Sequence, residues 1–347
     1  MTINNKEIPN LKHPNRNFFV VSLIFTLLYL SSFKEQDSPK PFHFQGLAQG
    51  TTYHISYYAE RQSVSQNQID SILTEIDHSL SIYSDKSLIT AFNKSAGGVK
   101  MDQHFKAVVS RSLDISDQSE GAFDITVYPL VDAWGFGLSK RSSLPDSAQI
   151  SNILENVGYH HLQIQGDWLL KDKAAVKIDV NGIAQGYSVD VIADFLESNN
   201  IYNYMVELGG ELRVKGRKNS RKKFKIGIEG VNASDLVPLT KYIEIDHGAI
   251  TTSGNYRKFY ESGNQKVSHL IDTKSGRYLQ NDLISVTVFA KDAMTADGYD
   301  NVLMSLGLAK AMRFLANEKA ISAYFVYTEN GMIRDTCSAG FPQIRQF

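Results

Sequence analysis

The chain has almost no cysteine and little excess charge. Its 347 residues include one cysteine, Cys337, and 36 basic residues against 37 acidic ones, which gives a formal net charge of −1. A single cysteine excludes an intrachain disulfide and a zinc site built on cysteines, although it leaves the redox compartment open. The balanced charge gives no reason to expect nucleic acid as a partner. A hydrophobic content of 42% is ample for a buried core, so we expect a globular protein.

Several motifs of well-known enzyme classes are also absent. The chain has neither G-x-x-x-x-G-K-[ST] nor G-x-G-x-x-G, so the Walker and dinucleotide fingerprints are excluded. No G-x-S-x-G precedes a strand–helix junction, which argues against a serine-hydrolase nucleophile elbow. No internal repeat recurs at a fixed period, which argues against a solenoid or a propeller.

The apolar run at residues 18–33 is uncharged and follows Lys12 and Arg16. This pattern predicts a signal peptide or signal anchor over residues 1–34, with the rest of the chain outside the cytoplasm. No cysteine is near enough for a lipoprotein anchor, and the exit lacks a clear A-x-A site, so anchoring and cleavage both stay open. Residues 35–41 are polar and contain proline, which predicts a linker to a domain over residues 42–347.

Hydrophobic periodicity predicts both helices and strands, without regular β-α-β alternation. The fold class that we expect is therefore α+β. The segment 121–137 is apolar and aromatic with glycines at both ends, and we expect it to be irregular and buried. Helices are predicted at 64–81, 105–118, 148–157, 295–306 and 309–317, and strands include 174–180, 283–290 and 320–328.

Two segments carry groups that could bind phosphate or metal. KIDVNGIAQGYSVD (177–190) reads as a strand, a glycine turn and a helix, and the helix start is either an anion site or only a packing turn. In MTADGYDNVLM (294–304), helical spacing places Asp297, Asp300 and Asn301 on one face. Their oxygens suit Mg²⁺ or Ca²⁺, although acids at a helix start also complement the helix dipole without binding anything.

Three further features have both a functional and a structural interpretation. In HGAITTSGNYRKFY, Ser253 and Arg257 could clamp an oxyanion or simply belong to a turn with a surface arginine. His269, in SHLIDTKSG, is expected in the middle of a strand, as a structural histidine or as a general base. The basic run RVKGRKNSRKKFK (213–225) predicts a solvated hairpin, or a docking patch for an acidic partner or membrane surface.

Taken together, several segments resemble one family. KIDVNGIAQGYSVD, MVELGGEL, AITTSGNYRKFY, SHLIDTKSGRYL and LISVTVFAKDAMTADGYDNVLMSLG occur in the order and spacing of the ApbE family, the FAD:protein FMN transferases. GAFDITVYPLVDAWGFG is similar to the family's upstream flavin-pocket segment. The similarity runs from about residue 42 to the C-terminus.

The resemblance implies a T-fold-like α+β architecture with mixed or antiparallel sheets and packed helices. It also implies Mg²⁺-dependent transfer of the FMN half of FAD to a threonine hydroxyl of an extracytoplasmic acceptor protein, with release of AMP. The implied metal ligands are the Ala184 carbonyl, Asp297 and Asn301. His269 is the candidate base that deprotonates the threonine, and Asp300 is the alternative. Contacts to FAD are expected at Tyr83, Ala122, Phe123, Asp124, Asp179, Gly182, Gln185, Ser253, Arg257 and His269.

The chain departs from the family pattern at three positions. It has Asn301 where the family usually has threonine, Asn181 where it has glycine, and Gln185 where lysine or glutamate is common. The amide oxygen of Asn301 can still coordinate a metal, whereas Gln185 brings no charge to the pyrophosphate. Two alternatives stay open, namely a pyrophosphatase that hydrolyses FAD to FMN and AMP, and a flavin-binding protein without catalysis.

Overall fold

The computed structural model describes residues 39–347 except 140–143, 219–220, 229–240, 256–258 and 263–264. Residues Pro39–Phe347 form one compact unit, and the predicted signal segment lies outside the described residues. Within those residues, no helix is long and apolar enough to span a bilayer. The first strand begins at Lys40, so Lys40 and Pro41, which we expected in the linker, belong to the folded unit. Proline is tolerated there because this strand is at the edge of its sheet.

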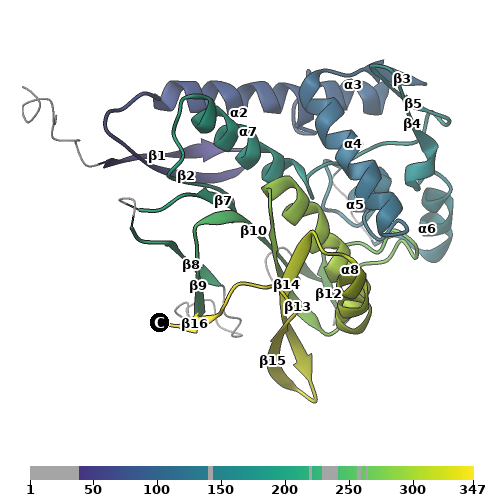
Figure 1. The fold of residues 1–347 in the computed structure, drawn as a ribbon. Coiled ribbons are helices and arrows are strands. Elements are labelled where there is room, and N and C mark those ends of the chain that lie inside the picture. Colours follow the sequence, from purple (N-terminus) through teal and green to yellow (C-terminus); the bar gives the residue numbers. More distant parts are fainter. Residues whose placement is uncertain (1–38, 140–143, 219–220, 229–240, 256–258, 263–264) are drawn as a thin grey trace, which may run out of the picture. The chain divides into compact units, whose positions relative to one another are not determined.

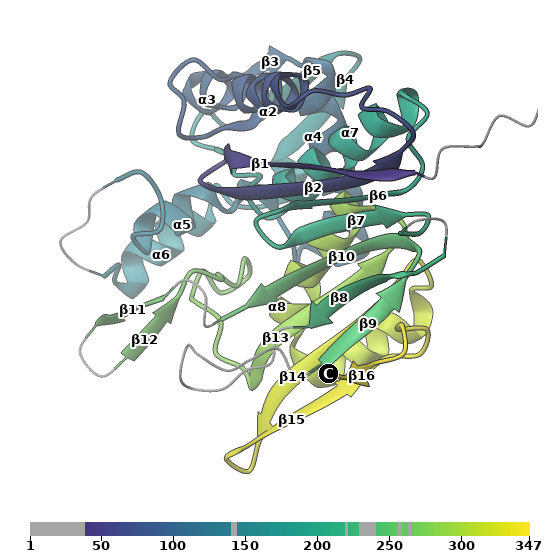
Figure 2. The same cartoon turned by 90° about the vertical axis from the view of Figure 1, so that its left-hand side faces the viewer.

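The centre of the fold is an eight-stranded sheet in which every neighbouring pair is antiparallel (Figures 1 and 2). Its strands, in spatial order, are β1 (Lys40–Ala48), β2 (Thr51–Ala59), β6 (Tyr204–Leu208), β7 (Glu211–Lys215), β10 (His247–Gly254), β13 (Leu283–Ala290), β14 (Ile321–Glu329) and β15 (Met332–Cys337). Three of its connections are tight hairpins, so the ends of the strands lie along two opposite edges of the sheet. One edge carries the β1–β2 and β6–β7 turns, and the other carries the start of β1 and the end of β7.

Both faces of this sheet are covered. On one face, Tyr53, Ile55 and Tyr57 of β2 alternate with exposed or partly exposed residues and pack against helices α2 (Gln66–Leu80) and α7 (Ala184–Ser198). On the other face, a three-stranded sheet of β8 (Phe224–Ile228), β9 (Lys241–Ile245) and β16 (Arg345–Gln346) packs against β7 and β14. The α+β class with antiparallel sheets is therefore confirmed.

Most of the helices that the structure describes match predicted ones, whereas the helices at Leu88–Lys94 and Tyr128–Ala133 were not predicted. The described helices are α2 (Gln66–Leu80), α3 (Leu88–Lys94), α4 (Gln103–Gln118), α5 (Tyr128–Ala133), α6 (Ser147–Leu154), α7 (Ala184–Ser198) and α8 (Ala293–Asn317). The last contains both predicted C-terminal helices, and the break between them lies at Gly307, whose φ of 70° interrupts the helical backbone. Shorter elements are η1 (Ile125–Val127), η2 (Tyr159–His161), β3 (Gly98–Lys100), β4 (Leu162–Gln165), β5 (Trp168–Lys171), β11 (Phe259–Ser262) and β12 (Gln265–Ser268).

Three predictions of local structure were wrong or incomplete. Residues 174–180 are not a strand, because the backbone of Ile178 hydrogen-bonds with the Asn93 side chain and Asp179 N–H donates to the Ile125 carbonyl. The segment 121–137 is buried as expected but contains η1 and α5. His269 lies in a bend immediately after β12, not in the middle of a strand.

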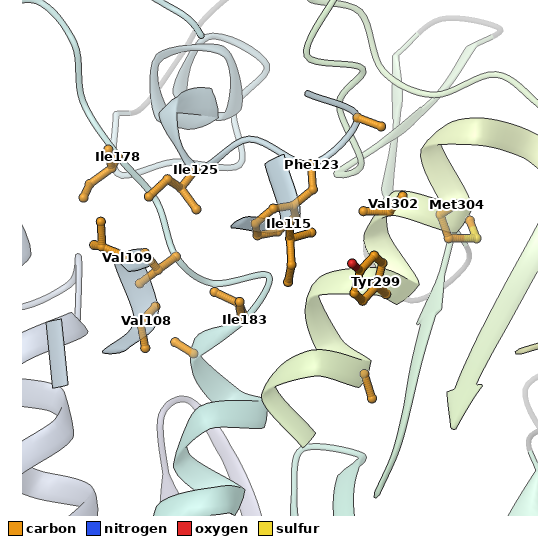
Figure 3. Close-up of a cluster of buried hydrophobic side chains, with 14 of the residues drawn as sticks. Val108, Val109, Ile115, Phe123, Ile125, Ile178, Ile183, Tyr299, Val302 and Met304 are labelled. Atoms are coloured by element: carbon orange, nitrogen blue, oxygen red, sulfur yellow. The ribbon is translucent and has the colours of Figure 1, made fainter. Parts of the chain in front are cut away.

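Helices α4, α7 and α8 meet in one hydrophobic cluster (Figure 3). Ile115 of α4 and Ile183, which precedes α7, pack there with Tyr299 of α8. Glycines permit the close approach, because a Cβ on Gly298 would come within 2.4 Å of Ile115 Cδ1. A Cβ on Gly186 of α7 would come within 2.4 Å of the Ala293 carbonyl oxygen at the start of α8.

We expect Gly186→Ala to destabilise the fold. In an unobstructed helix this change stabilises, but here the methyl group meets backbone that cannot rotate away, so the free energy of unfolding should fall by about 1–3 kcal/mol. Urea denaturation measures the effect. Gly97→Ala is the control, because a Cβ added there would have no heavy atom within 4 Å and the φ of Gly97 is outside the left-handed region. Equal or higher stability of Gly186→Ala would contradict the close contact of the two helices.

Candidate active site

A cavity of about 490 Å³ opens at one edge of the main sheet. Its walls come from the β1–β2 turn, the β6–β7 turn, the end of β10, the start of α7, α8 and the segment 122–136. This volume is in the usual range for a small-molecule site. Twelve of the residues that we predicted to bind or react line it: Tyr83, Ala122, Phe123, Asp124, Asp179, Gly182, Gln185, Ser253, His269, Asp297, Asp300 and Asn301.

Two predicted residues are not part of this wall. Ala184 is buried in the first turn of α7, and its carbonyl accepts a hydrogen bond from Ser188 Oγ at 2.9 Å. Arg257 lies outside the described residues. The carbonyl of Gly182 faces Asn301 of α8, and it accepts a hydrogen bond from Asn301 Nδ2 at 3.3 Å.

Helices α7 and α8 each cap the start of the other with a carboxylate. Asp297 of α8 accepts a hydrogen bond from Gly186 N–H at 2.9 Å, in the first turn of α7. In return, Asp190 of α7 accepts hydrogen bonds from Ala293 N–H at 2.9 Å and Met294 N–H at 2.8 Å, the first residues of α8. These N–H groups have no partner within their own helices, so the carboxylates fill a structural need.

The arginine of β7 supports this arrangement. Arg213 Nη1 lies 3.0 Å from Asp190 Oδ1 and 3.2 Å from Asp194 Oδ1. Burial raises the pKa of Asp190 to about 6, although the two backbone N–H groups and Arg213 oppose the shift. Asp190 is therefore ionised at neutral pH and holds α8 in place.

Asn301 lies at the centre of a cluster of oxygen atoms. Its Nδ2 donates to Asp300 Oδ1 at 2.9 Å, to the Asp297 carbonyl at 3.0 Å and to the Gly182 carbonyl at 3.3 Å. Asp297 and Asp300 are almost fully buried. The predicted helix face thus exists, and it adjoins the glycine turn before α7.

Glu211 is a site residue that the sequence did not reveal. It is buried at the start of β7, lines the cavity, and its carboxylate lies close to Asp297. Burial, and next the charge of Glu211, raise the pKa of Asp297 well above its usual range, against the Gly186 N–H bond that lowers it. A Cβ on Gly209 would lie 3.2 Å from both Glu211 Oε2 and Gln185 Nε2, so these side chains lie on the same side of the β6–β7 turn.

The β1–β2 turn adds two more residues that were missed. Gln49 and Thr51 line the cavity, and Gln49 Nε2 donates to Ser188 Oγ of α7 at 2.8 Å. Gln49 has a φ of 52° and precedes Gly50 with a φ of 74°, a left-handed pair that closes the hairpin. The Q-G dipeptide between two alternating runs was the available signal, but it predicts a turn and not a binding site.

The opposite wall is built from the segment predicted to be the flavin pocket. Asp124 accepts hydrogen bonds from Thr126 N–H at 2.8 Å and Tyr159 N–H at 2.6 Å, so it shapes this wall while also lining the cavity. Asp179 accepts Asn181 N–H at 2.8 Å and shapes the turn before α7. His269 packs edge-on against Phe136, with ring centroids 6.2 Å apart, and Tyr83 is exposed at the cavity mouth.

Comparison with known proteins agrees with this geometry. The model of the ApbE family matches residues 49–325. The chain belongs to the ApbE family. The resemblance seen in the sequence is therefore confirmed, and the matched range contains every residue that lines the cavity.

Relatives of the chain cover nearly its whole length. It is 35% identical to "FAD:protein FMN transferase" of Vibrio cholerae over 86% of this chain and 91% of that protein. It is 29% identical to the protein of the same name from Escherichia coli, over 95% and 97%. Among solved structures, "Flavin Transferase ApbE from Vibrio cholerae" has a TM-score of 0.79 at 34% identity, over 87% of this chain and 98% of that one. The apo form of the Pseudomonas stutzeri flavinyl transferase ApbE has a TM-score of 0.78 at 31% identity, over 88% and 97%.

The pKa of Asp190 in this ApbE chain predicts a dependence of stability on pH. Because its folded-state pKa of about 6 exceeds the value of about 3.9 in an unfolded chain, the folded state binds the proton more tightly. The stabilisation that comes from the proton bound to Asp190 is thus fully present below about pH 4 and is lost as the pH rises through about 6, while the hydrogen bonds of Asp190 to α8 remain. Asp190→Asn should make the slope of unfolding free energy less negative in this window.

Urea denaturation at a series of pH values measures that slope. Asp194→Asn is a matched control, because Asp194 also contacts Arg213 but its side chain is 70% exposed. Its slope should stay close to that of the unmodified chain. Equal slopes for Asp190→Asn and the unmodified chain would contradict the assignment.

Proposed function

We propose that the chain transfers the FMN half of FAD to a threonine hydroxyl of an acceptor protein and releases AMP. The observation that supports this most strongly is that one cavity gathers twelve of the fourteen different residues predicted for this reaction, from segments distant in the sequence. Membership of the ApbE family and the names of its relatives support the same reaction. The cavity wall combines apolar residues, such as Phe123 and Leu279, with acids and amides, as a flavin joined to a pyrophosphate requires.

The residues present fit a magnesium ion. Asp297, Asp300 and Glu211 are buried acids that line the cavity, and Asn301 and Gly182 add amide and carbonyl oxygens. The described residues contain no cluster of three His, Cys, Asp or Glu side chains that would hold a metal alone. Mg²⁺ usually binds through one or two carboxylates together with substrate phosphates, so this set is suitable.

We assign the metal to Asp297, Asn301 and a backbone carbonyl of the glycine turn, either that of Ala184, as the resemblance implies, or that of Gly182, which lines the cavity. The ion would neutralise charge that develops on the phosphates. Asn301 would present its amide oxygen after rotation of the amide group. Glu211 would keep the local charge negative enough to hold the cation.

The chain's own residues orient the substrates and move one proton. The turn at Gly182 lets the backbone approach the pyrophosphate, because glycine has no side chain there. His269 accepts the proton from the threonine hydroxyl, the threonine oxygen forms a bond to the FMN phosphorus, and the bond from that phosphorus to the bridging oxygen breaks. AMP leaves with the bridging oxygen. Asp300 is the alternative base.

We also propose that the reaction takes place on the periplasmic side of a bacterial inner membrane. The uncharged run at residues 18–33 after Lys12 and Arg16 supports this location. The segment either stays as an anchor or is removed by signal peptidase. N-terminal sequencing of the protein from membranes distinguishes these two forms.

Asp297→Asn should lower the rate of Mg²⁺-dependent AMP release from FAD by about 100-fold or more, because the metal loses its charged ligand. The amide keeps an oxygen that can accept the Gly186 N–H bond, so the fold should persist. The measurement is AMP formed over time with Mg²⁺ or with EDTA. Asp117→Asn, on the exposed side of α4, is the control. A full rate in Asp297→Asn would remove this residue from the mechanism.

His269→Ala should slow transfer to the acceptor by about 100-fold while FAD affinity stays nearly unchanged, because only proton removal is lost. Flavin fluorescence of the acceptor on a denaturing gel measures transfer, and fluorescence titration measures FAD binding. His247→Ala is the control, because its side chain is 80% exposed at the opposite edge of the sheet. Unchanged transfer in His269→Ala would leave Asp300 as the candidate base.

The same assays separate the competing functions. AMP release that needs no acceptor and leaves no flavin on protein would identify a pyrophosphatase. Tight FAD binding without AMP in the presence of acceptor and Mg²⁺ would identify a flavin-binding protein, with Asn301 and Gln185 as the altered positions.

A further inference from the structure

A cluster of basic residues lies at the edge of the sheet opposite the cavity. The run 213–225 contains eight lysines and arginines and no acid. Arg213 and Lys215 point to α7, where they pair with Asp190 and Glu197. The remaining residues follow β7 and lead into β8, and we call Arg217, Lys218, Arg221, Lys222 and Lys223 the basic hairpin.

The basic hairpin has more positive charge than its neighbours neutralise. Asp246 pairs with Arg217 at 2.8 Å and with Lys223 at 3.6 Å. No carboxylate in the described part of the chain forms an ion pair with the other three. Arg221 and Lys222 are exposed, and the Lys218 ammonium lies 5.5 Å from the centre of the Phe224 ring.

The sheet register places this hairpin beside the start of the folded unit. Lys40 pairs with Ala59, Tyr57 with Tyr204, and Tyr204 with Lys215, so the start of β1 and the end of β7 share one edge. Three strand spacings separate them, which is about 14 Å. Figures 1 and 2 both show the start of β1 on the same side as the end of β7 and the start of β8.

The chain therefore enters the folded unit, at the start of β1, next to the basic hairpin. The apolar run ends at Lys34, and β1 begins at Lys40. Six residues span at most about 20 Å. The membrane surface is thus within reach of the basic hairpin whenever residues 18–33 are inserted.

The cavity lies at the other edge. The β1–β2 turn, the β6–β7 turn and Gly254 line it, and they are at the opposite ends of the same strands. A strand of nine residues such as β2 is about 30 Å long. An acceptor protein held at the basic hairpin would be about that far from the reacting groups, which favours a lipid surface over an acidic acceptor as the occupant.

An exposed aromatic residue accompanies the basic hairpin. Tyr202 is 48% exposed just before β6, and the Lys215 ammonium lies 5.3 Å from its ring centre. Tyrosine beside lysine and arginine is the composition that proteins place at the headgroup level of a membrane.

We propose that the basic hairpin binds the anionic phospholipid headgroups of the membrane that holds residues 18–33, and thereby directs the cavity away from the membrane. This inference rests on the membrane anchoring in the proposed function but not on its flavin chemistry. Each basic residue close to an anionic surface strengthens binding about fivefold, so the cations of Lys218, Arg221 and Lys222 suffice to orient a tethered domain.

The test is hydrogen–deuterium exchange of the full-length protein in lipid nanodiscs. Discs of phosphatidylcholine alone are compared with discs that also contain phosphatidylglycerol. Peptides covering residues 215–225 should exchange severalfold more slowly in the anionic discs, and high salt should remove the difference because it screens the charges. Peptides covering residues 305–319 should exchange equally in both.

Charge-reversal variants test whether the basic side chains of the hairpin cause the protection. Lys218→Glu, Arg221→Glu and Lys222→Glu together should abolish the protection. The matched control combines Lys310→Glu, Arg313→Glu and Lys319→Glu, which change the net charge equally at exposed positions on α8 and just after it, and it should preserve the protection. Equal exchange of the hairpin in both discs would overturn the proposal, as would protection that appears only when the acceptor protein is added. AMP release in detergent is measured separately, so failure of the flavin chemistry is distinguishable from failure of lipid binding.

Discussion

The reciprocal capping of α7 and α8 is the interaction on which the site depends. Asp190 satisfies the first N–H groups of α8, and Asp297 satisfies an N–H group of α7. Hydrogen bonds to a charged group typically contribute about 1.5–3 kcal/mol each. The contact is possible only because Gly186 has no side chain where it meets Ala293. Moving either helix would therefore expose buried carboxylates and separate the glycine turn from the acidic face of α8.

The strand β7 runs from the cavity to the opposite edge of the sheet, so it contributes side chains to both. Alternate residues of β7 face α7, and they are Glu211 at the cavity, Arg213 in the middle and Lys215 at the other end. The chemistry along this face thus changes from acidic to basic over five residues. This gradient places the acids beside the cavity and leads into the basic hairpin, which explains why the two surfaces differ although the total charge is nearly balanced.

Helical spacing was enough to predict that Asp297, Asp300 and Asn301 share one face of α8, because residues three and four apart in a helix lie side by side. Val176, Ile178 and Val180 are buried, but the alternating pattern that predicted a strand here could not identify their backbone partners. A strand needs a neighbouring strand, whereas Ile178 instead pairs with the Asn93 side chain from a distant helix. Such partners depend on tertiary structure, so local pattern misassigned the segment.

Within the site, Glu211 and Ala184 are two further residues whose surroundings the sequence could not predict. Glu211 follows two glycines and looks like an ordinary strand residue, and only the packing of β7 against α8 brings it near Asp297. Ala184 belongs to the motif that carried the family resemblance, yet its carbonyl is used inside α7. Order along the chain therefore located the turn but could not show which of its carbonyls faces the cavity.

The buried acids also constrain what can occupy the cavity. Burial and next the charge of Glu211 make ionisation of Asp297 less favourable, because little solvent is present to screen the repulsion. A pyrophosphate entering alone would add further negative charge at the same place. A divalent cation would reverse both effects at once, because it attracts the carboxylates and the phosphates together. The electrostatics of the polypeptide thus support the proposal that a divalent cation would bind here together with the negatively charged substrate.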